Sequence, residues 1–217
     1  MRQIAIVGAG GFGREVLAVL EEQVARTAVL HGARICFVDD AKAGQTINGV
    51  EVVSAAAYAT LEGERQFVVA ISSSEARERE AARLLAGGAT PFTVVAANAI
   101  LSGHGSLGEG AIMSPFTIVS PNASIGRYFH CNYHSYVAHD CVIGDFVTFA
   151  PAVRCNGGVV IEDHAYIGTG AVIKQGTPGR PVVIGRGAVV GMGAVVTKSV
   201  APGITVVGNP ARPLGAA

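Results

Sequence analysis

The sequence predicts a protein of two parts: an amino-terminal α/β domain followed by a parallel β-helix built from six-residue repeats. Strand-like and helix-like segments alternate up to about Thr93, which indicates a parallel sheet covered by helices. After residue 100 an apolar residue recurs at every sixth position. The 29 glycines and the absence of tryptophan also favour a repeat with tight corners. We expect the first domain to span residues 1–95 and the second to span residues 96–217.

The amino-acid composition indicates which classes of partner to expect: membrane, nucleic acid, metal ion or small molecule. Half of the residues are hydrophobic, yet no apolar run reaches the roughly 20 residues that cross a bilayer. The amino terminus enters a strand-like run without the pattern of a signal peptide, so we expect a cytoplasmic protein with no membrane insertion. The net charge of zero gives no reason to expect nucleic acid and favours a small-molecule partner. The four cysteines lack the spacing of a zinc site, and no metal is expected.

The elements of the first domain follow from short apolar runs and helical periodicity. Buried strands are expected at residues 4–7, 34–38 and 67–71, and helices at residues 14–22 and 75–85.

A glycine-rich turn between the first strand and the first helix marks a candidate phosphate site. Its pattern matches the G-x-G-x-x-G fingerprint of Rossmann-like domains, and Asp39 ends the second strand where a ribose-binding acid belongs. Alone, this motif indicates NAD, and an NAD-linked oxidoreductase is one alternative. Any nucleotide diphosphate can use the same backbone N–H groups, however, and the domain is short for a dinucleotide fold. The candidate residues are Gly8, Gly10, Gly11, Phe12, Gly13, Asp39 and Ser72.

The six-residue period of the second part predicts short strands that each turn one apolar column inward. Three such strands make one triangular coil, so residues 18 apart lie above one another at about 4.8 Å. Glycines such as Gly108, Gly126 and Gly144 are expected to ease the corners. The column runs through Leu101, Leu107, Met113, Val119, Ile125, Cys131, Val137, Ile143, Phe149, Cys155, Ile161, Ile167 and Ile173, and it resumes at Ile184, Val190 and Val196.

The chemistry is expected at one corner of this helix. In the predicted register His139 points outward, and Gly157 lies 18 residues further along on the same edge. An imidazole beside an accessible peptide N–H can remove a proton while the N–H stabilises an oxyanion. Asp140 is placed to orient the imidazole.

The segment from Asn132 to Phe146, which contains the His139-Asp140 pair, resembles the active-site coil of the PglD/NeuD-like family of bacterial sugar acetyltransferases, and the hexapeptide repeats resemble those of left-handed β-helix acyltransferases. This resemblance implies that His139 is the general base, that Asp140 assists it and that Asn132 helps to hold the sugar amine. It also implies a homotrimer with active sites between adjacent subunits.

The same resemblance suggests the substrates. Asp39, Asp40 and Lys42 match a segment that contacts uridine, which favours a UDP-linked 4-amino sugar as the acceptor of an N-acetyl group. Acetyl-CoA is the expected donor, along a groove that continues from Gly157. The residues expected to bind it are Gly157, Thr169, Lys174, Gln175, Arg186, Gly191 and Pro210.

Two other functions remain open from the sequence. One is O-acetylation of a sialic-acid-type sugar, and the other is a non-catalytic scaffold that binds a nucleotide. Some members of the family also carry a second histidine where this chain has Thr148.

Overall fold

The computed structural model describes residues 2–215, which form two compact units. The first unit contains the chain up to Ala97 together with Glu109–Ile112, and the second contains Asn98–Gly108 and the chain from Met113 onward. The predicted domain ranges also include residues 1, 216 and 217, which lie outside the described part. No helix within residues 2–215 is both long enough and apolar enough to cross a bilayer.

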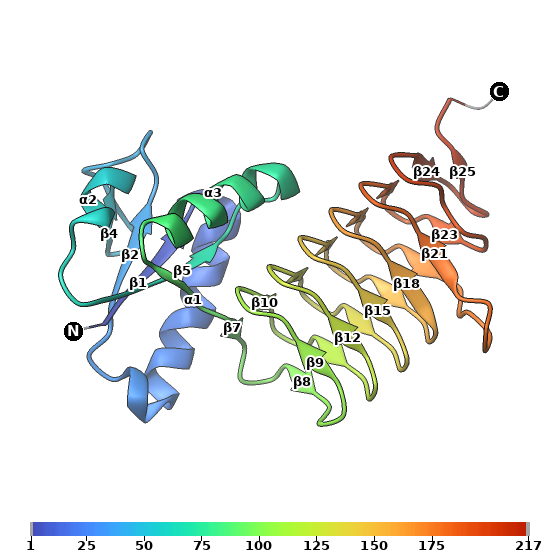
Figure 1. The fold of residues 1–217 in the computed structure, drawn as a ribbon, viewed down its shortest axis with the longest axis horizontal. Helices are drawn as coiled ribbons and strands as arrows, with labels where there is room; N and C mark the ends of the chain where they lie inside the picture. Colours follow the sequence, from blue (N-terminus) through green and yellow to red (C-terminus); the bar gives the residue numbers. More distant parts are fainter. Residues whose placement is uncertain (1, 216–217) are drawn as a thin grey trace. The chain divides into compact units, whose positions relative to one another are not determined.

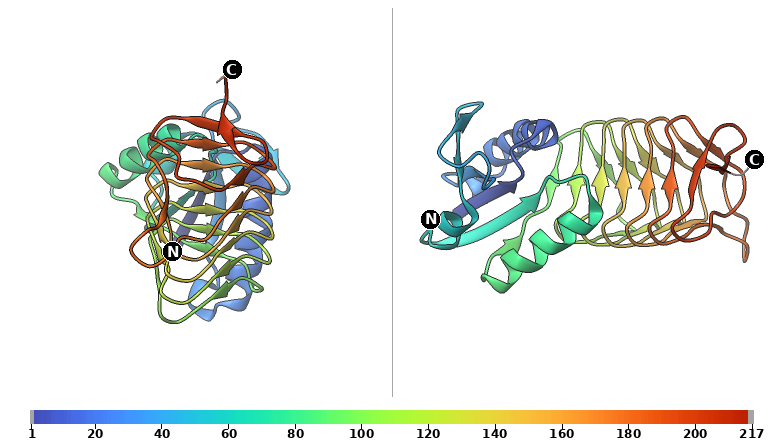
Figure 2. Two further views of the ribbon diagram at one scale, coloured as in Figure 1. Left: turned by 90° about the vertical axis from the view of Figure 1, so that its right-hand side faces the viewer. Right: turned by 90° about the horizontal axis from the view of Figure 1, so that it is seen from above.

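The first unit is a sheet with the strand order β3-β4-β2-β1-β5-β6, parallel except for the β3–β4 pair. The crossovers β1–α1–β2 and β5–α3–β6 run in opposite directions along the sheet. Right-handed crossovers therefore put α1 and α3 on opposite faces, as Figure 1 and Figure 2 show. The elements are β1 (Arg2–Val7), α1 (Gly11–Arg26), η1 (Ala28–Leu30), β2 (Arg34–Val38), β3 (Thr46–Ile47), β4 (Val50–Val53), α2 (Ala55–Ala59), β5 (Glu64–Val69), α3 (Ser74–Ala86), β6 (Thr90–Pro91) and β7 (Val94–Val95).

The predicted strands and helices of this unit are present, with boundaries that differ by a few residues. The short hairpin β3–β4 was not predicted, although Asn48-Gly49 is a typical hairpin turn and both residues have positive φ. Helix α2 was also missed. Its amino terminus is capped by the Ser54 side chain, which accepts a hydrogen bond from Ala57 N–H at 3.1 Å.

The second unit is a left-handed parallel β-helix, whose stacked coils are visible in Figure 2. Its short strands form three faces. Face 1 contains β8 (Ile100–Leu101), β11 (Ile118–Val119), β14 (Tyr136–Val137), β17 (Arg154–Cys155), β20 (Val172–Ile173) and β23 (Val195–Val196). Face 2 contains β9 (Ser106–Leu107), β12 (Ser124–Ile125), β15 (Val142–Ile143), β18 (Val159–Ile161) and β21 (Val182–Ile184). Face 3 contains β10 (Ile112–Met113), β13 (His130–Cys131), β16 (Thr148–Phe149), β19 (Tyr166–Ile167), β22 (Val189–Val190), β24 (Thr205–Val207) and the antiparallel β25 (Arg212–Pro213).

The strand pairs confirm the predicted step of 18 residues. Val119 pairs with Val137, and Val137 pairs with Cys155. The predicted apolar column fills the interior from Met113 onward, whereas Leu101 in the first coil is 42% exposed. We call the corners ridge 1, ridge 2 and ridge 3, according to the face whose strands they follow.

The corners use a left-handed residue that the sequence did not reveal. A residue with φ near +60° recurs every six positions, and most of these residues are not glycine. The glycines that were predicted to ease the turn, such as Gly108 and Gly126, do not have positive φ. They are required for a different reason: a Cβ on Gly108 would lie 2.4 Å from Gly126 O in the next coil. These glycines therefore permit close stacking of the coils. The left-handed residues include Phe116, Asn122, Tyr128, His134, Asp140, Phe146, Ala152 and His164.

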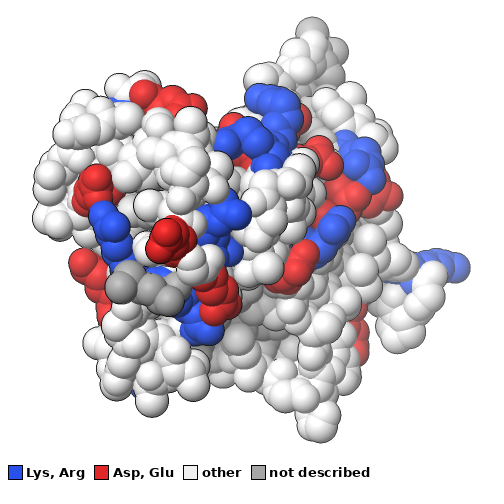
Figure 3. Space-filling view, turned by 60° about the vertical axis from the view of Figure 1, so that its left-hand side comes forward, with Lys and Arg blue, Asp and Glu red and all other residues white. Residues whose placement is uncertain are grey.

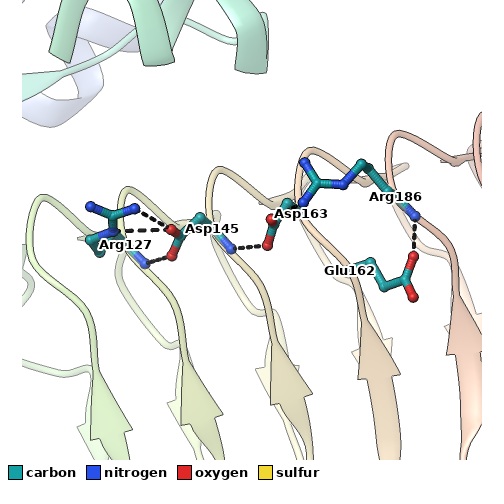
Figure 4. A network of polar contacts seen from close by, with 5 residues as sticks. All are labelled: Arg127, Asp145, Glu162, Asp163 and Arg186. Carbon is teal, nitrogen blue, oxygen red and sulfur yellow. Dashed lines mark hydrogen bonds and ion pairs between the residues drawn. The ribbon is translucent and has the colours of Figure 1, made fainter. Parts of the chain in front are cut away.

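Charged side chains link successive coils along ridge 2 (Figure 4). Asp145 accepts hydrogen bonds from Arg127 N–H at 2.7 Å and from the Arg127 guanidinium at 2.6 Å. Asp145 N–H donates to Asp163 at 2.8 Å, and Asp163 in turn forms an ion pair with Arg186. Each carboxylate thus satisfies a corner N–H that the stacking of strands leaves without a partner.

We expect Asp145→Ala to lower the free energy of unfolding by about 1–3 kcal/mol, because hydrogen bonds to a charged group are lost. Burial raises the pKa of Asp145, but hydrogen bonds and charge from Arg127 outweigh burial and lower it. A lowered carboxyl pKa means that the stabilisation is present at neutral pH and is lost as the pH falls through that pKa. Denaturant unfolding as a function of pH measures both effects. A difference between wild type and variant that persists in strong acid would contradict this account.

Candidate active site

The structure brings His139 and Gly157 together on ridge 1. His139 follows β14 with 67% of its side chain exposed, and Gly157 follows β17 one coil further along. Gly158 N–H donates to His139 O at 3.0 Å, which connects the two corners. A Cβ on Gly157 would lie 2.6 Å from Cε1 of the imidazole. The ring therefore lies directly against the glycine, in an arrangement that admits no side chain there.

Asp140 contacts the imidazole from the same corner. Its Oδ2 lies 2.7 Å from His139 Nδ1. Hydrogen bonds from His139 and then from Asn122 lower the pKa of Asp140, so the carboxylate is charged at neutral pH. A carboxylate on Nδ1 favours the tautomer in which Nδ1 carries the proton, which leaves the lone pair of Nε2 available to accept another.

Gly157 N–H is available as a hydrogen-bond donor. Among residues 2–215, it donates to no other residue. The carbonyl of the same peptide, Asn156 O, accepts from the Cys141 thiol at 3.2 Å, and the N–H of a trans peptide points the opposite way.

Several equivalent corner positions in neighbouring coils have no such donor. Some carry proline, which has no N–H, and others are satisfied by a carboxylate of the next coil. The proline positions are Pro115, Pro121 and Pro151, and the carboxylate-satisfied positions are Arg127 and Asp145. Unlike these five positions, Gly157 has a backbone N–H that can donate a hydrogen bond to an anionic oxygen.

A cavity of about 440 Å³ lies beside this group. His139, Asp140 and Gly157 line it on one side, and the loop from Gln175 to Pro181 lines it on the other. This loop interrupts the repeat between β20 and β21, and it is held by paired backbone hydrogen bonds between Thr177 and Arg180. The sequence placed Gln175 and the loop near the site, but it did not identify Thr177, Pro178 and Gly179 as part of its wall.

The predicted acetyl-CoA residues lie on several ridges. Gln175 lines the cavity with Gly157, and Lys174 is its exposed neighbour. Thr169 and Gly191 follow strands of face 3 and lie on ridge 3, whereas Arg186 lies on ridge 2, paired with Asp163. Within a single chain, the predicted acetyl-CoA residues therefore do not form one site.

A second cavity of about 350 Å³ lies near the carboxyl terminus of the β-helix. Its lining includes Thr197, Lys198 and Ser199, which follow β23 on ridge 1, and Arg212. Pro210, which follows a cis peptide bond, directly precedes three of its lining residues. Ridge 1 thus carries two hollows, of which the second contains two basic side chains.

Asn132 lies on ridge 3, away from His139 of the same chain. Its Nδ2 donates to Phe149 O at 2.8 Å, as Asn156 Nδ2 donates to Ile173 O at 2.7 Å. Both side chains thus link one coil to the next. Thr148 is buried in β16 on face 3 and pairs with His130 in the sheet, so it does not line the cavity at His139.

The glycine-rich turn of the first unit is built as its sequence predicts. A Cβ on Gly13 would lie 2.0 Å from Gly8 O, so only glycine permits this packing of helix on strand. Asp39 Oδ2 accepts from Ala9 N–H at 3.1 Å, and Lys42 Nζ donates to Ala9 O at 2.8 Å. Asp39 and Lys42 therefore fix the turn from the second strand.

A cavity of about 260 Å³ lies at the carboxyl ends of β1, β2 and β5. Gly8, Asp39 and Asp40 line it, as do Glu80 and Arg83 from α3, which the sequence did not indicate. Gly10 begins α1 without a side-chain cap, so the first N–H groups of this helix suit an anion. Gly11, Phe12 and Gly13 form the first turn of α1; Ser72 does not line the cavity, and its carbonyl accepts from Arg77 at 3.4 Å.

The distribution of charged side chains, of potential metal ligands and of cysteines bears on which kinds of site the protein contains. On the face that Figure 3 shows, basic and acidic side chains are interspersed, in keeping with the net charge of zero. Within residues 2–215, no group of three or more histidine, cysteine, aspartate or glutamate side chains is arranged to hold a metal ion. The four cysteines are buried and form no disulfide.

Comparison with known proteins decides the family. A model described as the PglD N-terminal domain matches residues 3–84. The chain is 51% identical over 213 residues to GDP-perosamine N-acetyltransferase of Escherichia coli O157:H7, an alignment that covers 98% of this chain and 96% of that protein. The chain belongs to the PglD/NeuD-like family of bacterial sugar acetyltransferases. Members of this family are acetyl-CoA-dependent acetyltransferases, and this chain is one of them.

Solved structures agree with this assignment. WeeI from Acinetobacter baumannii AYE is 47% identical with a TM-score of 0.93, covering 99% of this chain and 100% of that one. PerB from Caulobacter crescentus, solved with CoA and GDP-perosamine, is 26% identical with a TM-score of 0.85, covering 99% of this chain and 98% of that one. The two-part architecture of this acetyltransferase is thus shared along its whole length.

Proposed function

We propose that this acetyltransferase moves the acetyl group of acetyl-CoA to the amino group of a GDP-linked 4-amino sugar. The observation that carries the proposal is the contact between the exposed His139 imidazole and Gly157, whose N–H has no partner among residues 2–215, beside a cavity of about 440 Å³. An acceptor amine, a thioester and a base can meet in such a space.

In the proposed mechanism His139 Nε2 takes a proton from the amine as its nitrogen attacks the thioester carbonyl carbon. The new C–N bond turns the carbonyl oxygen into an oxyanion, which Gly157 N–H stabilises. Asp140 stabilises the protonated imidazole. The oxyanion then collapses, the C–S bond breaks, and the CoA thiolate leaves and receives the proton from His139.

The nucleotide is proposed to bind at the glycine-rich turn of the first unit, in the cavity lined by Gly8, Asp39 and Asp40. The sequence favoured UDP through the segment that contains Lys42. Lys42 is engaged with Ala9 O, however, and the relative at 51% identity is named for a GDP-linked sugar. The contact of Lys42 removes the support that this residue gave to UDP, and the name of the relative supports GDP as the carrier.

Calorimetric titration with GDP, UDP and dTDP tests the carrier. We expect GDP to bind at least about tenfold more tightly than UDP, a difference of roughly 1.4 kcal/mol. Tighter binding of UDP would reverse the assignment of the carrier, and equal binding would contradict a preference for GDP. Neither result would affect the proposal that the enzyme transfers an acetyl group.

Acetyl-CoA is proposed to lie along ridge 1, with its thioester at Gly157 and its nucleotide end toward the cavity that contains Lys198 and Arg212. The predicted ligands on ridge 3, namely Asn132, Thr169 and Gly191, then belong to the site through a second copy of the chain. A homotrimer in which ridge 3 of one copy faces ridge 1 of the next would satisfy this. Light scattering of the purified protein measures the mass of the assembly, and a monomer would exclude a shared site.

An acceptor assay separates this function from the alternatives that the sequence left open. Release of the CoA thiol is measured with a GDP-linked 4-amino sugar and with free sialic acid. Amine-dependent release supports N-acetylation, and release with sialic acid alone would indicate O-acetylation. Nucleotide binding without release from either acceptor would indicate a non-catalytic scaffold.

A further inference from the structure

Asn122 contacts the catalytic pair from the coil below. It lies on ridge 1, 18 residues before Asp140, and its Nδ2 donates to Asp140 Oδ1 at 3.2 Å. Asp140 Oδ2 lies 2.7 Å from His139 Nδ1. Each oxygen of the carboxylate thus has one partner, and the two contacts together define the plane of the carboxylate.

The exposure of the pair explains why a second contact matters. The side chain of Asp140 is 59% exposed, and an exposed ion pair holds two side chains in one geometry only weakly. A hydrogen bond from a neighbouring coil restricts the rotation of the carboxylate. It also favours the charged form: Asn122 follows His139 among the groups that lower the pKa of Asp140.

The backbone places Asn122 for this contact. Asn122 and Asp140 both have left-handed φ, 61° and 58°, so the two corners turn alike and stack in register. Asp140 N–H also donates to Pro121 O at 3.4 Å. Asparagine tolerates left-handed φ better than most residues and can donate from its side chain. Serine or alanine at residue 122 would not meet both requirements.

We infer that Asn122 is a positioning residue for acetyl transfer, which holds the Asp140 carboxylate so that it orients the His139 imidazole. This inference rests on the proposed function of His139 as the base. Asn122 itself does not line the cavity, and its side-chain contact with the pair is to Asp140, so its effect passes through Asp140.

A pH test of the pair has to consider the titratable groups around it. Within the described residues that line the cavity, the titratable side chains are His139 and Asp140 themselves. The Cys141 thiol contacts the carbonyls of His139, at 3.7 Å, and of Asn156, at 3.2 Å. A hydrogen bond with Cys155 lowers the pKa of this thiol to about 7. His104, one coil below Asn122, accepts a hydrogen bond from Asn122 N–H through its carbonyl at 3.2 Å.

The test compares Asn122→Gly and Asn122→Asp with wild type. Both replacements accept left-handed φ, so the corner is kept. For Asn122→Gly we expect kcat to fall about three- to tenfold, with KM for acetyl-CoA changed by less than about twofold. The acid limb of the kcat/KM profile should move to lower pH, because a less ordered carboxylate stabilises the protonated imidazole less.

Asn122→Asp should move the acid limb in the opposite direction, to higher pH, because a second carboxylate beside Asp140 stabilises the protonated imidazole. Asn48→Gly is the matched control, since Asn48 is also an asparagine with left-handed φ, at 49°, and lies in the β3–β4 hairpin, outside the linings of the cavities at His139 and at the glycine-rich turn. It should leave kcat and both limbs unchanged.

Profiles of both Asn122 variants that coincide with wild type would overturn the inference, as would a loss of kcat with neither limb moved in variants whose thermal midpoints match wild type. Failure of the proposed function looks different. In that case wild type itself would not acetylate the GDP-linked amino sugar, or His139→Asn would retain its activity, whatever the Asn122 variants do.

Discussion

Replacing His139 by alanine is expected to lower kcat by about 10²- to 10⁴-fold, the usual contribution of a positioned general base. The thermal midpoint should not change, because the imidazole is largely exposed and packs on the surface of ridge 1. Binding of CoA and of GDP should persist in calorimetry, since neither nucleotide end is proposed to reach the imidazole. Initial rates of thiol release measure the loss.

His104→Ala is a control for this experiment, because His104 is another exposed histidine on ridge 1 and lies outside the cavity at His139. Its rate should equal that of wild type. A His139→Ala enzyme within tenfold of the wild-type rate would remove the proposed base.

Replacing Gly157 by alanine is expected to cost about 10²-fold in kcat without unfolding the protein. The new methyl group would lie 2.6 Å from His139 Cε1 and 2.7 Å from Nε2, so the exposed ring must move away. Movement of the ring separates Nδ1 from Asp140 and displaces Nε2 from the acceptor amine. A displacement of about 1 Å at a catalytic group has a cost of this size.

Gly103→Ala is the matched control for Gly157→Ala. Gly103 occupies the equivalent position on ridge 1 three coils earlier, and a Cβ there would meet nothing within 4 Å. We expect wild-type kcat and thermal midpoint for this variant. If Gly157→Ala retained full activity, the close contact between imidazole and glycine would have no catalytic importance.

The sequence predicts the β-helix well because one physical rule governs every coil. An inward side chain at every sixth position must be apolar, and the column from Met113 to Val196 obeys this rule regardless of tertiary context. The same register places His139 and Gly157 on one edge of the β-helix. Their contact follows from the stacking of corners, whereas the hydrogen bond between His139 and Asp140 forms within a single corner.

Features that depend on local geometry were beyond the sequence. The corner residues with left-handed φ include phenylalanine, tyrosine and alanine, which propensity alone would not select for that conformation. Glycines such as Gly126 were predicted to ease the turn at each corner, whereas their role is to leave room for the backbone of the next coil. Asn122 carried no signal, because its importance depends on a contact between coils.

Residues from different elements also could not be assembled from the sequence. Glu80 and Arg83 reach the cavity of the first unit from α3, and the spacing along a helix does not reveal which cavity its side chains line. For the same reason the sequence grouped Arg186 with Gln175, although the two follow strands of different faces.

A crystal structure of the protein with CoA and a GDP-linked 4-amino sugar tests the central claim most directly. The account predicts that the sugar amine lies within hydrogen-bonding distance, roughly 2.6–3.2 Å, of His139 Nε2, with the CoA sulfur beside Gly157. A ternary complex with the amine on another ridge, or with Gly157 N–H turned away from the CoA sulfur, would contradict it.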